Sequence, residues 1–321
     1  MVLSLEVAFV RLGIGYAGLR FNPFLKLQRN FYLEEYRSVW QKNSSCASFD
    51  PDLIYVPTEG RCYFKNIEFD TVLTFDKWGR KYSSREHYHN HLIATMGDSF
   101  TMGWGVNDDD TFSAVLSELI KKPVINLGVS SYGTYRELKR LVNHPLFSKI
   151  ETIILQYCDN DLEENLILNS PQKETPKERF QSMFLETKPY SINYRGILSA
   201  LHNMANFNIS GLGHSLFQNT KIQKHNAETH LNFTPHLKGL VKVLGMFPQI
   251  KNKRLIIFYI NSKSWEEKKF YNFGSLVSEA FPKATVLDLS FKVDDYYLLD
   301  DHLNKSGHRF LATELQKALM E

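Results

Sequence analysis

Three features that often reveal a function directly are missing from this sequence: CxxC motifs, clustered basic residues and an uninterrupted apolar run. Only three cysteines occur among 321 residues, and none forms a CxxC pair, so we expect no metal site and at least one free thiol. The formal net charge is only +3, and no basic block alternates with aromatic residues, so we expect no nucleic-acid partner. We also expect no cofactor.

The three cysteines have different settings along the chain. Cys46 and Cys62 are able to pair if this region lies outside the cytoplasm, although their separation in sequence does not establish a disulfide. Cys158 ends an apolar stretch and is expected to be a small core residue.

The composition and the order of apolar segments predict a globular α/β protein. Hydrophobic residues make up 43% of the chain and aromatic residues 13%, which is ample for a core. The length allows one large domain or two modest ones. Strands are predicted at 91–96, 123–127, 151–157, 254–260 and 284–289, with helical patterns between them. This alternation predicts a doubly wound, mainly parallel sheet with helices on both faces.

The most informative stretch is LIATMGDSFTMGWG, residues 92–105, which places Ser99 on a Gly-Asp-Ser turn directly after an apolar strand. A strand that turns into a helix presents its last side chains and free N–H groups at the carboxyl edge of the sheet, where open α/β folds bind ligands. Gly97 can take a backbone conformation closed to other residues, so Ser99 can point outward. Ser99 is therefore a candidate nucleophile, and helix capping by Ser99 or Asp98 is the alternative.

Three later stretches supply groups that a serine nucleophile needs. They are PVINLGVSSYGTYRELKRL at 123–141, ETIILQYCDNDLEEN at 151–165 and LLDDHLNKSGHRFLATEL at 298–315. A serine hydroxyl needs a base within hydrogen-bond reach and a third group that orients this base. Fixed donors must also stabilise the negative charge that develops on the carbonyl oxygen.

Together with the Gly-Asp-Ser turn, these stretches resemble the four blocks of the SGNH (GDSL) hydrolase family over residues 91–321. The resemblance implies a flavodoxin-like strand order, with Ser99 as nucleophile and the side chain of Asn160 as an oxyanion donor. The second block usually has a glycine whose N–H donates, and Ser131 stands at that position, so the N–H groups of Ser99 and Ser131 would complete the oxyanion hole. In the last block, His302 is the expected base and Asp300 its orienting acid.

The last block departs from the common Asp-x-x-His spacing, because Leu299 stands three residues before His302. The Asp-x-His spacing resembles the surface-polysaccharide branches of the family, which include esterases and acyltransferases. Asp301 is the alternative orienting acid. His308 is the alternative base, although it reads as a residue of the first turn of the final helix.

The resemblance implies a serine esterase or deacylase that removes O-acyl groups, expected to be O-acetyl groups, from a glycan or a small ester. An O-acyltransferase would use the same machinery, with a sugar hydroxyl in place of water. A glycan-binding module derived from a hydrolase is the third alternative, favoured by the shifted histidine spacing and the missing glycine. The sequence does not predict the oligomeric state.

The chain before residue 91 is predicted to form two segments. Residues 45–90 alternate aromatic and polar residues and contain turn signals, so they predict a small β-rich extension that leans on the hydrolase sheet. Within it, His87, His89 and His91 repeat with period two; this spacing suits metal binding, but a polar strand or loop explains it more simply.

A helical insertion at about 165–250 is expected to form a lid or substrate wall.

Residues 1–44 form the other segment, which begins with an apolar stretch interrupted by Glu6, Arg11 and Arg20. A membrane span needs about 20 mainly apolar residues, and the three charges prevent this stretch from qualifying alone. It also lacks the basic start and the small-residue cleavage site of a signal peptide. The stretch resembles the membrane-proximal end of signal anchors that precede this catalytic domain in some relatives. An amphipathic helix packed on the domain or on a membrane surface is the alternative. The location therefore stays open between the cell envelope and the cytoplasm.

Overall fold

The computed structural model describes residues 37–83, 91–167, 175, 178, 181, 233–260, 272–300 and 302–320. The strands are β1 (Ala47–Asp50), β2 (Ile54–Pro57), β3 (Gly60–Lys65), β4 (Asp70–Asp76), β5 (Gly79–Arg80), β6 (Leu92–Met96), β7 (Val124–Asn126), β8 (Ile150–Cys158), β9 (Arg254–Ile260) and β10 (Thr285–Leu287). The α-helices are α3 (Ser99–Met102), α4 (Phe112–Ile120), α5 (Thr134–Val142), α6 (Asp161–Ile167), α9 (Thr234–Gly245), α10 (Phe273–Ala280) and α11 (Lys305–Met320). Short 3₁₀ helices lie at Trp40–Lys42, Asp108–Asp110, Phe147–Lys149, Pro248–Ile250 and Val293–Asp295.

Eight strands form one sheet in the order β10-β9-β8-β6-β7-β5-β4-β3. The five strands from β7 to β10 in this order pair in parallel, so that the first strand of the parallel unit, β6, lies between the second, β7, and the third, β8. This is the flavodoxin-like order, and the predicted α/β fold is confirmed. The order reverses beside β6, so the carboxyl end of β6 lies at the topological switch point, where such sheets bind ligands.

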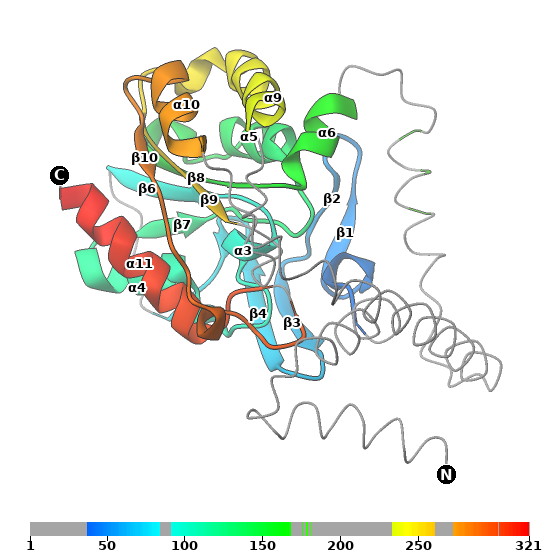
Figure 1. The fold of residues 1–321 in the computed structure, drawn as a ribbon. Helices are drawn as coiled ribbons and strands as arrows, with labels where there is room; N and C mark the ends of the chain where they lie inside the picture. Colours follow the sequence, from blue (N-terminus) through cyan, green and yellow to red (C-terminus); the bar gives the residue numbers. More distant parts are fainter. Residues whose placement is uncertain are drawn as a thin grey trace, which may run out of the picture.

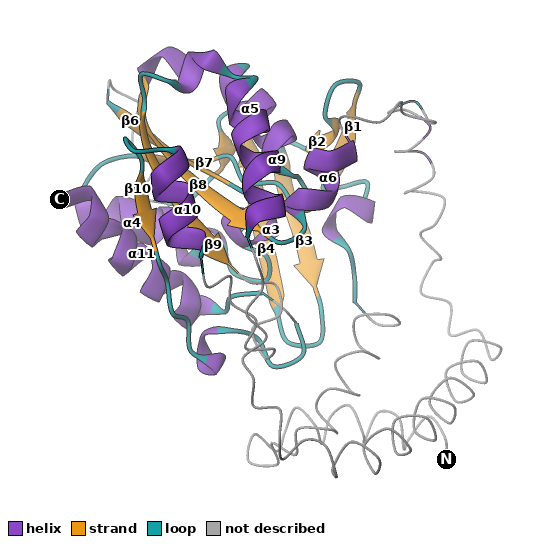
Figure 2. Cartoon of the chain, turned by 45° about the horizontal axis from the view of Figure 1, so that its top comes forward, coloured by secondary structure: helices purple, strands orange, loops and turns teal. Residues whose placement is uncertain are grey.

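Helices cover both faces of the parallel sheet, as the doubly wound prediction requires (Figure 1). On one face, α5, α9 and α10 bury side chains such as Leu138, Leu240 and Val277. On the other face, α4 and α11 bury side chains that include Phe112 and Leu311. Figure 2 shows the sheet passing between these two helical layers. The strands in the middle are apolar on both sides, which is typical of parallel strands that helices cover twice.

The β-rich extension before β6 is present, and most of it continues the main sheet. Strands β3, β4 and β5 follow one another antiparallel, and β5 pairs with β7 through Arg80 and Asn126. Strands β1 and β2 form a separate two-stranded hairpin. A disulfide joins Cys46 to Cys62 of β3, and Cys158 is buried and free. The extension is therefore joined internally by the disulfide and externally to the parallel strands by β5.

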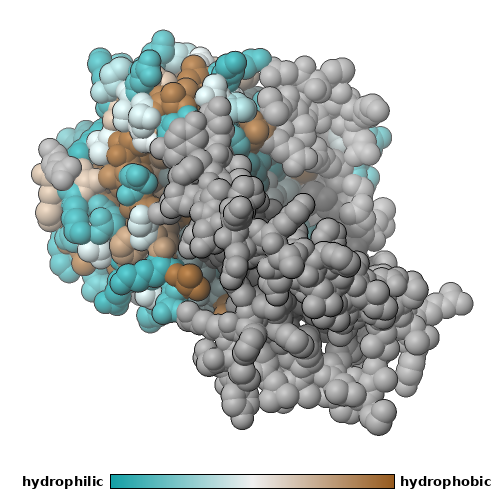
Figure 3. Space-filling view, viewed as in Figure 1, coloured by the Kyte–Doolittle hydropathy of each residue, from teal (hydrophilic) through white to brown (hydrophobic). Residues whose placement is uncertain are grey.

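The described surface mixes hydrophilic and hydrophobic side chains on the face that Figure 3 shows. Large apolar side chains that are exposed lie on separate elements: Phe49, Tyr63, Ile67, Leu119, Val241, Met246, Val293 and Met320. Among the residues that the structure describes, no helix combines the length and the apolar character that crossing a membrane requires. Residues 1–36, on which the prediction of an anchor rests, lie outside the described residues.

Candidate active site

Ser99 is the first residue of α3 and lies immediately beyond the carboxyl end of β6. The tight turn requires Gly97, whose φ is +154° and whose added Cβ would lie 2.2 Å from Gln156 Oε1. Asp98 caps the helix, since its side chain accepts a hydrogen bond of 2.9 Å from the N–H of Phe100. The serine is only 8% exposed. The predicted strand-turn-helix setting is confirmed, and it is Asp98 that caps the helix.

The structure brings Ser99, His302 and Asp300 into one hydrogen-bonded row. Ser99 Oγ lies 2.7 Å from His302 Nε2. The other ring nitrogen, His302 Nδ1, is hydrogen-bonded to Asp300 Oδ1, and Asp300 is fully buried. Although 203 residues separate Ser99 from His302 in the chain, the loop before α11 carries the imidazole to the end of β6. This is the arrangement in which a base can take a hydroxyl proton and an acid can orient the base.

Trp104 supports the imidazole from the loop after α3. Its indole ring stacks on His302, with ring centroids 4.7 Å apart and an interplanar angle of 15°. Its Nε1 also donates a hydrogen bond of 3.2 Å to Asp300 Oδ2. Phe100 lies against the same imidazole, 4.9 Å between centroids. The ring plane of His302 and Oδ2 of Asp300 are therefore held from the segment that follows Ser99.

Ser131 is exposed and adopts φ +60°, the left-handed conformation that favours glycine. The serine therefore stands in a backbone conformation that glycine adopts more readily. The loop is held from two sides: Gln41 Nε2 donates 2.9 Å to Ser131 Oγ, and Arg136 Nη2 donates 2.5 Å to the carbonyl of Ser131.

Asn160 follows the end of β8 and is exposed. Its Nδ2 donates a hydrogen bond of 3.1 Å to Asp98 Oδ2, next to the serine. Because an amide nitrogen carries two hydrogens, Nδ2 is able to donate a second hydrogen bond. Burial raises the pKa of Asp98, while the hydrogen bonds from Phe100 and Asn160 and the charge of His302 act in the opposite direction.

The alternative base, His308, has a structural role on α11. Its Nδ1 accepts a hydrogen bond of 3.1 Å from the N–H of Phe112, the first residue of α4. Burial, together with the positive charges of Arg80 and His302, lowers the pKa of His308 to about 3. A neutral ring that accepts a helix N–H satisfies a group that the helix itself leaves unpaired. The alternative acid, Asp301, lies outside the described residues.

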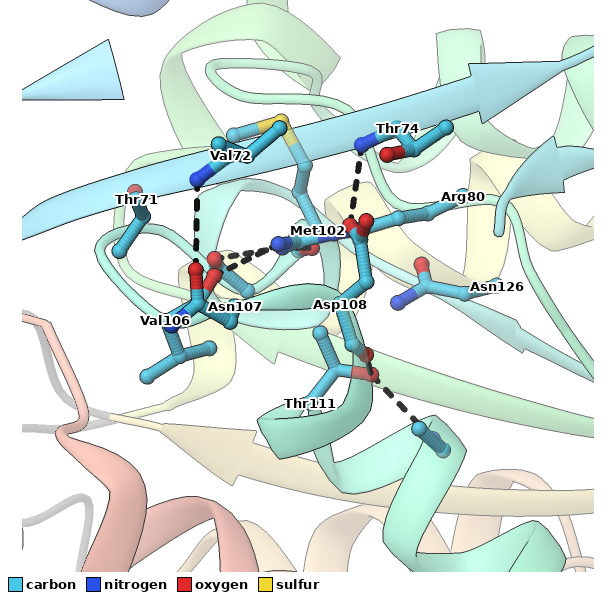
Figure 4. Close-up of polar contacts among 12 residues, drawn as sticks. Thr71, Val72, Thr74, Arg80, Met102, Val106, Asn107, Asp108, Thr111 and Asn126 are labelled. Atoms are coloured by element: carbon cyan, nitrogen blue, oxygen red, sulfur yellow. Dashed lines mark hydrogen bonds and ion pairs between the residues drawn. The ribbon is translucent and has the colours of Figure 1, made fainter. Parts of the chain in front are cut away.

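Arg80 of β5 supports the loop that follows the nucleophile (Figure 4). Its Nη1 donates to the carbonyls of Met102 and Gly103 at 2.5 and 2.6 Å, and its Nη2 donates to the carbonyl of Val106 at 2.6 Å. Nε pairs with Asp108 Oδ1 at 3.0 Å. The carbonyls of Met102 and Gly103 lie at the end of α3, so a buried guanidinium of the extension fixes the end of the helix that begins with Ser99.

Glu68, in the turn between β3 and β4, was not predicted from the sequence. Its carboxylate accepts hydrogen bonds from the N–H groups of Leu298, Leu299 and Asp300 at 2.7, 2.9 and 2.8 Å. An acidic residue in a polar hairpin turn carries no local signal of such a contact, because its partners are about 230 residues away. Gln41, Arg80 and Trp104 were not predicted either; Gln41 contacts Ser131, Arg80 contacts Met102 and Trp104 contacts Asp300, which lie 90, 22 and 196 positions away.

Within the described parts of the chain, no group of three or more His, Cys, Asp or Glu side chains is placed to hold a metal ion. His87 and His89 lie outside these parts, and His91 is exposed and lies 2.6 Å from Glu151. The aromatic residues of the insertion also lie outside the described residues. No metal or cofactor is therefore assigned to the site.

Searches by sequence find no matching protein-family model and no matching curated protein. By structure, the chain is similar to a member of the lipolytic protein G-D-S-L family from Veillonella parvula (13% identity, 72% of this chain and 99% of the other, TM-score 0.41). It is also similar to a lipase/acylhydrolase from Enterococcus faecalis (14%, 71% and 95%, TM-score 0.40). A third similar structure is a carbohydrate esterase family 2 enzyme from Corynascus thermopiles (11%, 75% and 68%, TM-score 0.42). Because these similarities are low, the chemistry of the site rests on the residues of this chain alone.

Proposed function

We propose that this protein is a serine ester hydrolase in which Ser99 is the nucleophile, His302 the general base and Asp300 the acid that orients it. The observation that carries the proposal is the row of hydrogen bonds from Ser99 Oγ through the two ring nitrogens of His302 to Asp300. A binding protein has no need for a base held 2.7 Å from a serine hydroxyl and supported by a buried carboxylate. The geometry therefore favours an enzyme over the glycan-binding alternative.

In the first half of the reaction, Ser99 Oγ attacks the ester carbonyl carbon while its proton moves to His302 Nε2. Asp300, on Nδ1, holds the ring in the tautomer whose Nε2 accepts, and it stabilises the imidazolium that forms. When the tetrahedral intermediate collapses, His302 returns the proton to the leaving alcohol. The product is an acyl-Ser99 intermediate.

The oxyanion of the tetrahedral intermediate needs donors at the rim of the site. The N–H of Ser99, the N–H of Ser131 and the second hydrogen of Asn160 Nδ2 are proposed to supply them. Ser131 and Asn160 are exposed, so a substrate can reach both. The N–H of Ser99 has no partner within its own helix, because the first residues of a helix have none. Each such donor accounts for roughly 10²- to 10³-fold in rate.

In the second half, water attacks the acyl carbon while its proton moves to His302, and His302 returns this proton to Ser99 Oγ as the bond to the acyl group breaks and the acid leaves. If a sugar hydroxyl replaces water at this step, the same residues perform acyl transfer. The narrower proposal of a glycan O-acetyl ester as substrate rests on the Asp-x-His spacing of Asp300 and His302. No contact among the described residues favours transfer over hydrolysis.

Intact-mass spectrometry after treatment with a fluorophosphonate tests the nucleophile. We expect one adduct on the wild-type chain and none on Ser99→Ala, with the hydrolysis of 4-nitrophenyl acetate abolished and the melting temperature nearly unchanged. Ser130→Ala is a matched control, since it removes the hydroxyl of another buried serine, which precedes Ser131 and donates a hydrogen bond to Gln41. This variant should still form the adduct. An adduct that persists on Ser99→Ala would contradict the assignment.

A second assay separates the two reactions of an acyl enzyme. An O-acetylated sugar is incubated with the protein in the presence of an unacetylated acceptor, and free acetate and acetylated acceptor are quantified. Hydrolysis predicts free acetate in proportion to substrate loss. Acetylated acceptor that depends on Ser99 would instead identify a transferase.

A further inference from the structure

The loop that carries Asp300 is fastened at its tip by a residue of the β-rich extension. Glu68 Oε1 accepts from the N–H of Leu298 at 2.7 Å, and Oε2 accepts from the N–H groups of Leu299 and Asp300 at 2.9 and 2.8 Å. Three successive N–H groups are thus bound by one carboxylate. The third of them belongs to the acid that orients His302.

The base of the same loop is closed by its own backbone. The N–H of Tyr297 donates 3.0 Å to the carbonyl of His302, and Tyr296 pairs with Leu303 in an isolated bridge. Between these closures the chain must present Asp300 inward, where the residue is fully buried. Backbone N–H groups at the tip need partners, and in the described structure the carboxylate of Glu68 supplies three of them.

The turn that carries Glu68 is itself held in place. Phe69 lies 5.3 Å from the ring of Tyr297, so the turn packs directly on the start of the loop. The side chain of Asn66 pairs with both backbone groups of Ser38, at 2.7 Å to its N–H and 3.2 Å to its carbonyl. A carboxylate on such a turn can fix the position of the loop.

We propose that Glu68 is a positioning residue, which sets the place of Asp300 and through it the orientation of His302 toward Ser99. The proposal rests on the proposed ester hydrolysis. A carboxylate suits this task because its two oxygens accept several bonds and its charge strengthens each of them. Burial raises the pKa of Glu68 and the charge of Asp300 adds to this, whereas the hydrogen bonds from the three N–H groups act in the opposite direction, since they stabilise the carboxylate.

The side-chain chemistry predicts a graded effect of substitution. Glu68→Gln keeps one acceptor oxygen and turns an NH₂ group toward an N–H, so it loses at least one of the three bonds. Glu68→Ala loses all three. Displacement of a catalytic group by about 1 Å can reduce a rate roughly 10²-fold.

The test compares full-length variants in 4-nitrophenyl acetate hydrolysis and in the rate at which a fluorophosphonate labels Ser99. We expect kcat to fall about tenfold in Glu68→Gln and about 100-fold in Glu68→Ala, with KM within about twofold of wild type. The rate of labelling should fall in the same order, because it needs the same base but no substrate binding.

Two variants of the same hairpin serve as controls. Asp70→Asn changes an exposed carboxylate that pairs with Lys65, and it should leave both kcat and the melting temperature unchanged. Leu73→Val shortens a fully buried side chain of β4, so it should lower the melting temperature and leave kcat unchanged. A structural effect alone would make Glu68→Gln behave like Leu73→Val.

The outcomes are distinguishable. If wild type turns over and is labelled at Ser99, while both folded Glu68 variants match its kcat and labelling rate, the positioning role is wrong and the proposed function stands. If wild type is neither active nor labelled, the proposed function fails and the role of Glu68 fails with it. If Glu68→Ala does not fold, Glu68→Gln alone decides: an unchanged kcat and labelling rate would contradict the positioning role, and a roughly tenfold loss would support it.

Discussion

The indole of Trp104 hydrogen-bonds Asp300 Oδ2, the oxygen opposite the one that holds His302. The same indole stacks on the imidazole, so one side chain restrains two members of the hydrogen-bonded row. Trp104 lies five residues after Ser99, on the loop whose carbonyls Arg80 holds. The nucleophile and the support of its base therefore come from one short segment.

Substitutions in this row should lower kcat by different amounts. Asp300→Asn should reduce it about 10³- to 10⁴-fold, because an amide no longer fixes the tautomer or supports the imidazolium. Trp104→Phe keeps an aromatic ring on His302 and removes only the hydrogen bond, so we expect a loss of roughly tenfold. Asp301→Asn is the matched control and should stay near wild type. A larger loss in Asp301→Asn than in Asp300→Asn would exchange their roles.

Asn160→Ala should lower kcat roughly 10²-fold with little change in KM, the pattern of a contact made mainly in the transition state. Asn160→Asp, of the same shape but with an acceptor in place of the donor, should be at least as slow. Steady-state kinetics on 4-nitrophenyl acetate measure both. If kcat of Asn160→Ala equals that of wild type, the side chain only supports Asp98, with which it bonds at 3.1 Å.

The role of Ser131 is proposed to rest on its main chain. Ser131→Gly should keep kcat within about threefold, since glycine readily adopts the φ of +60° seen here. Ser131→Val should lose about 1–2 kcal/mol of stability, because a β-branched residue is strained in that conformation, and its kcat should fall as the N–H is displaced. Urea unfolding and kinetics separate the two effects. Equal losses of kcat in both variants would assign the function to the hydroxyl.

His308 should make the protein less stable as the pH falls. Its pKa in the folded protein is about 3, below the ordinary value of 6.5, so between these values the unfolded chain binds a proton that the folded one does not. The free energy of unfolding therefore decreases as the pH drops from about 6.5 toward 3, by at most about 1.4 kcal/mol per pH unit from this residue.

His308→Gln tests this, because glutamine can accept the N–H of Phe112 but does not titrate. Urea unfolding at pH 7 and pH 4.5 should show a smaller difference for the variant than for wild type. Some difference remains, since burial also lowers the pKa of His144 to about 4 and that of His236. An unchanged difference would mean that His308 is protonated in the folded protein at pH 4.5.

The parallel sheet was predictable because each strand is a local apolar run, and the central strands are buried on both sides, as β8 illustrates. Ser99 was predictable because its turn has a local signature in Gly97, whose conformation the structure shows to be closed to other residues. The proximity of His302 to Ser99 could be predicted from the order of the segments along the chain, because the loop that precedes the last helix lies at the carboxyl edge of the sheet.

The support of these groups could not be predicted in the same way. Glu68 lies in the short turn between β3 and β4, and Gln41 lies in the 3₁₀ helix Trp40–Lys42 that precedes the extension. Their contacts with the loops of Asp300 and Ser131 depend on how β3–β5 join the sheet. The single pair between Arg80 and Asn126 makes that junction, and a two-residue strand leaves no periodic pattern to detect. Contacts between segments that are far apart in the chain, such as this pair, are visible only once the whole fold is known.

The junction between β5 and β7 also has a consequence for self-association. Without the extension, β7 would be the last strand of a parallel sheet and would offer a bare row of N–H and C=O groups to any other chain. Natural proteins protect such rows because they promote aggregation. Strands β5, β4 and β3 move the outermost row to β3, where Arg61 and Lys65 bring positive charge to it. The segment that fastens the site also protects the sheet from unwanted pairing.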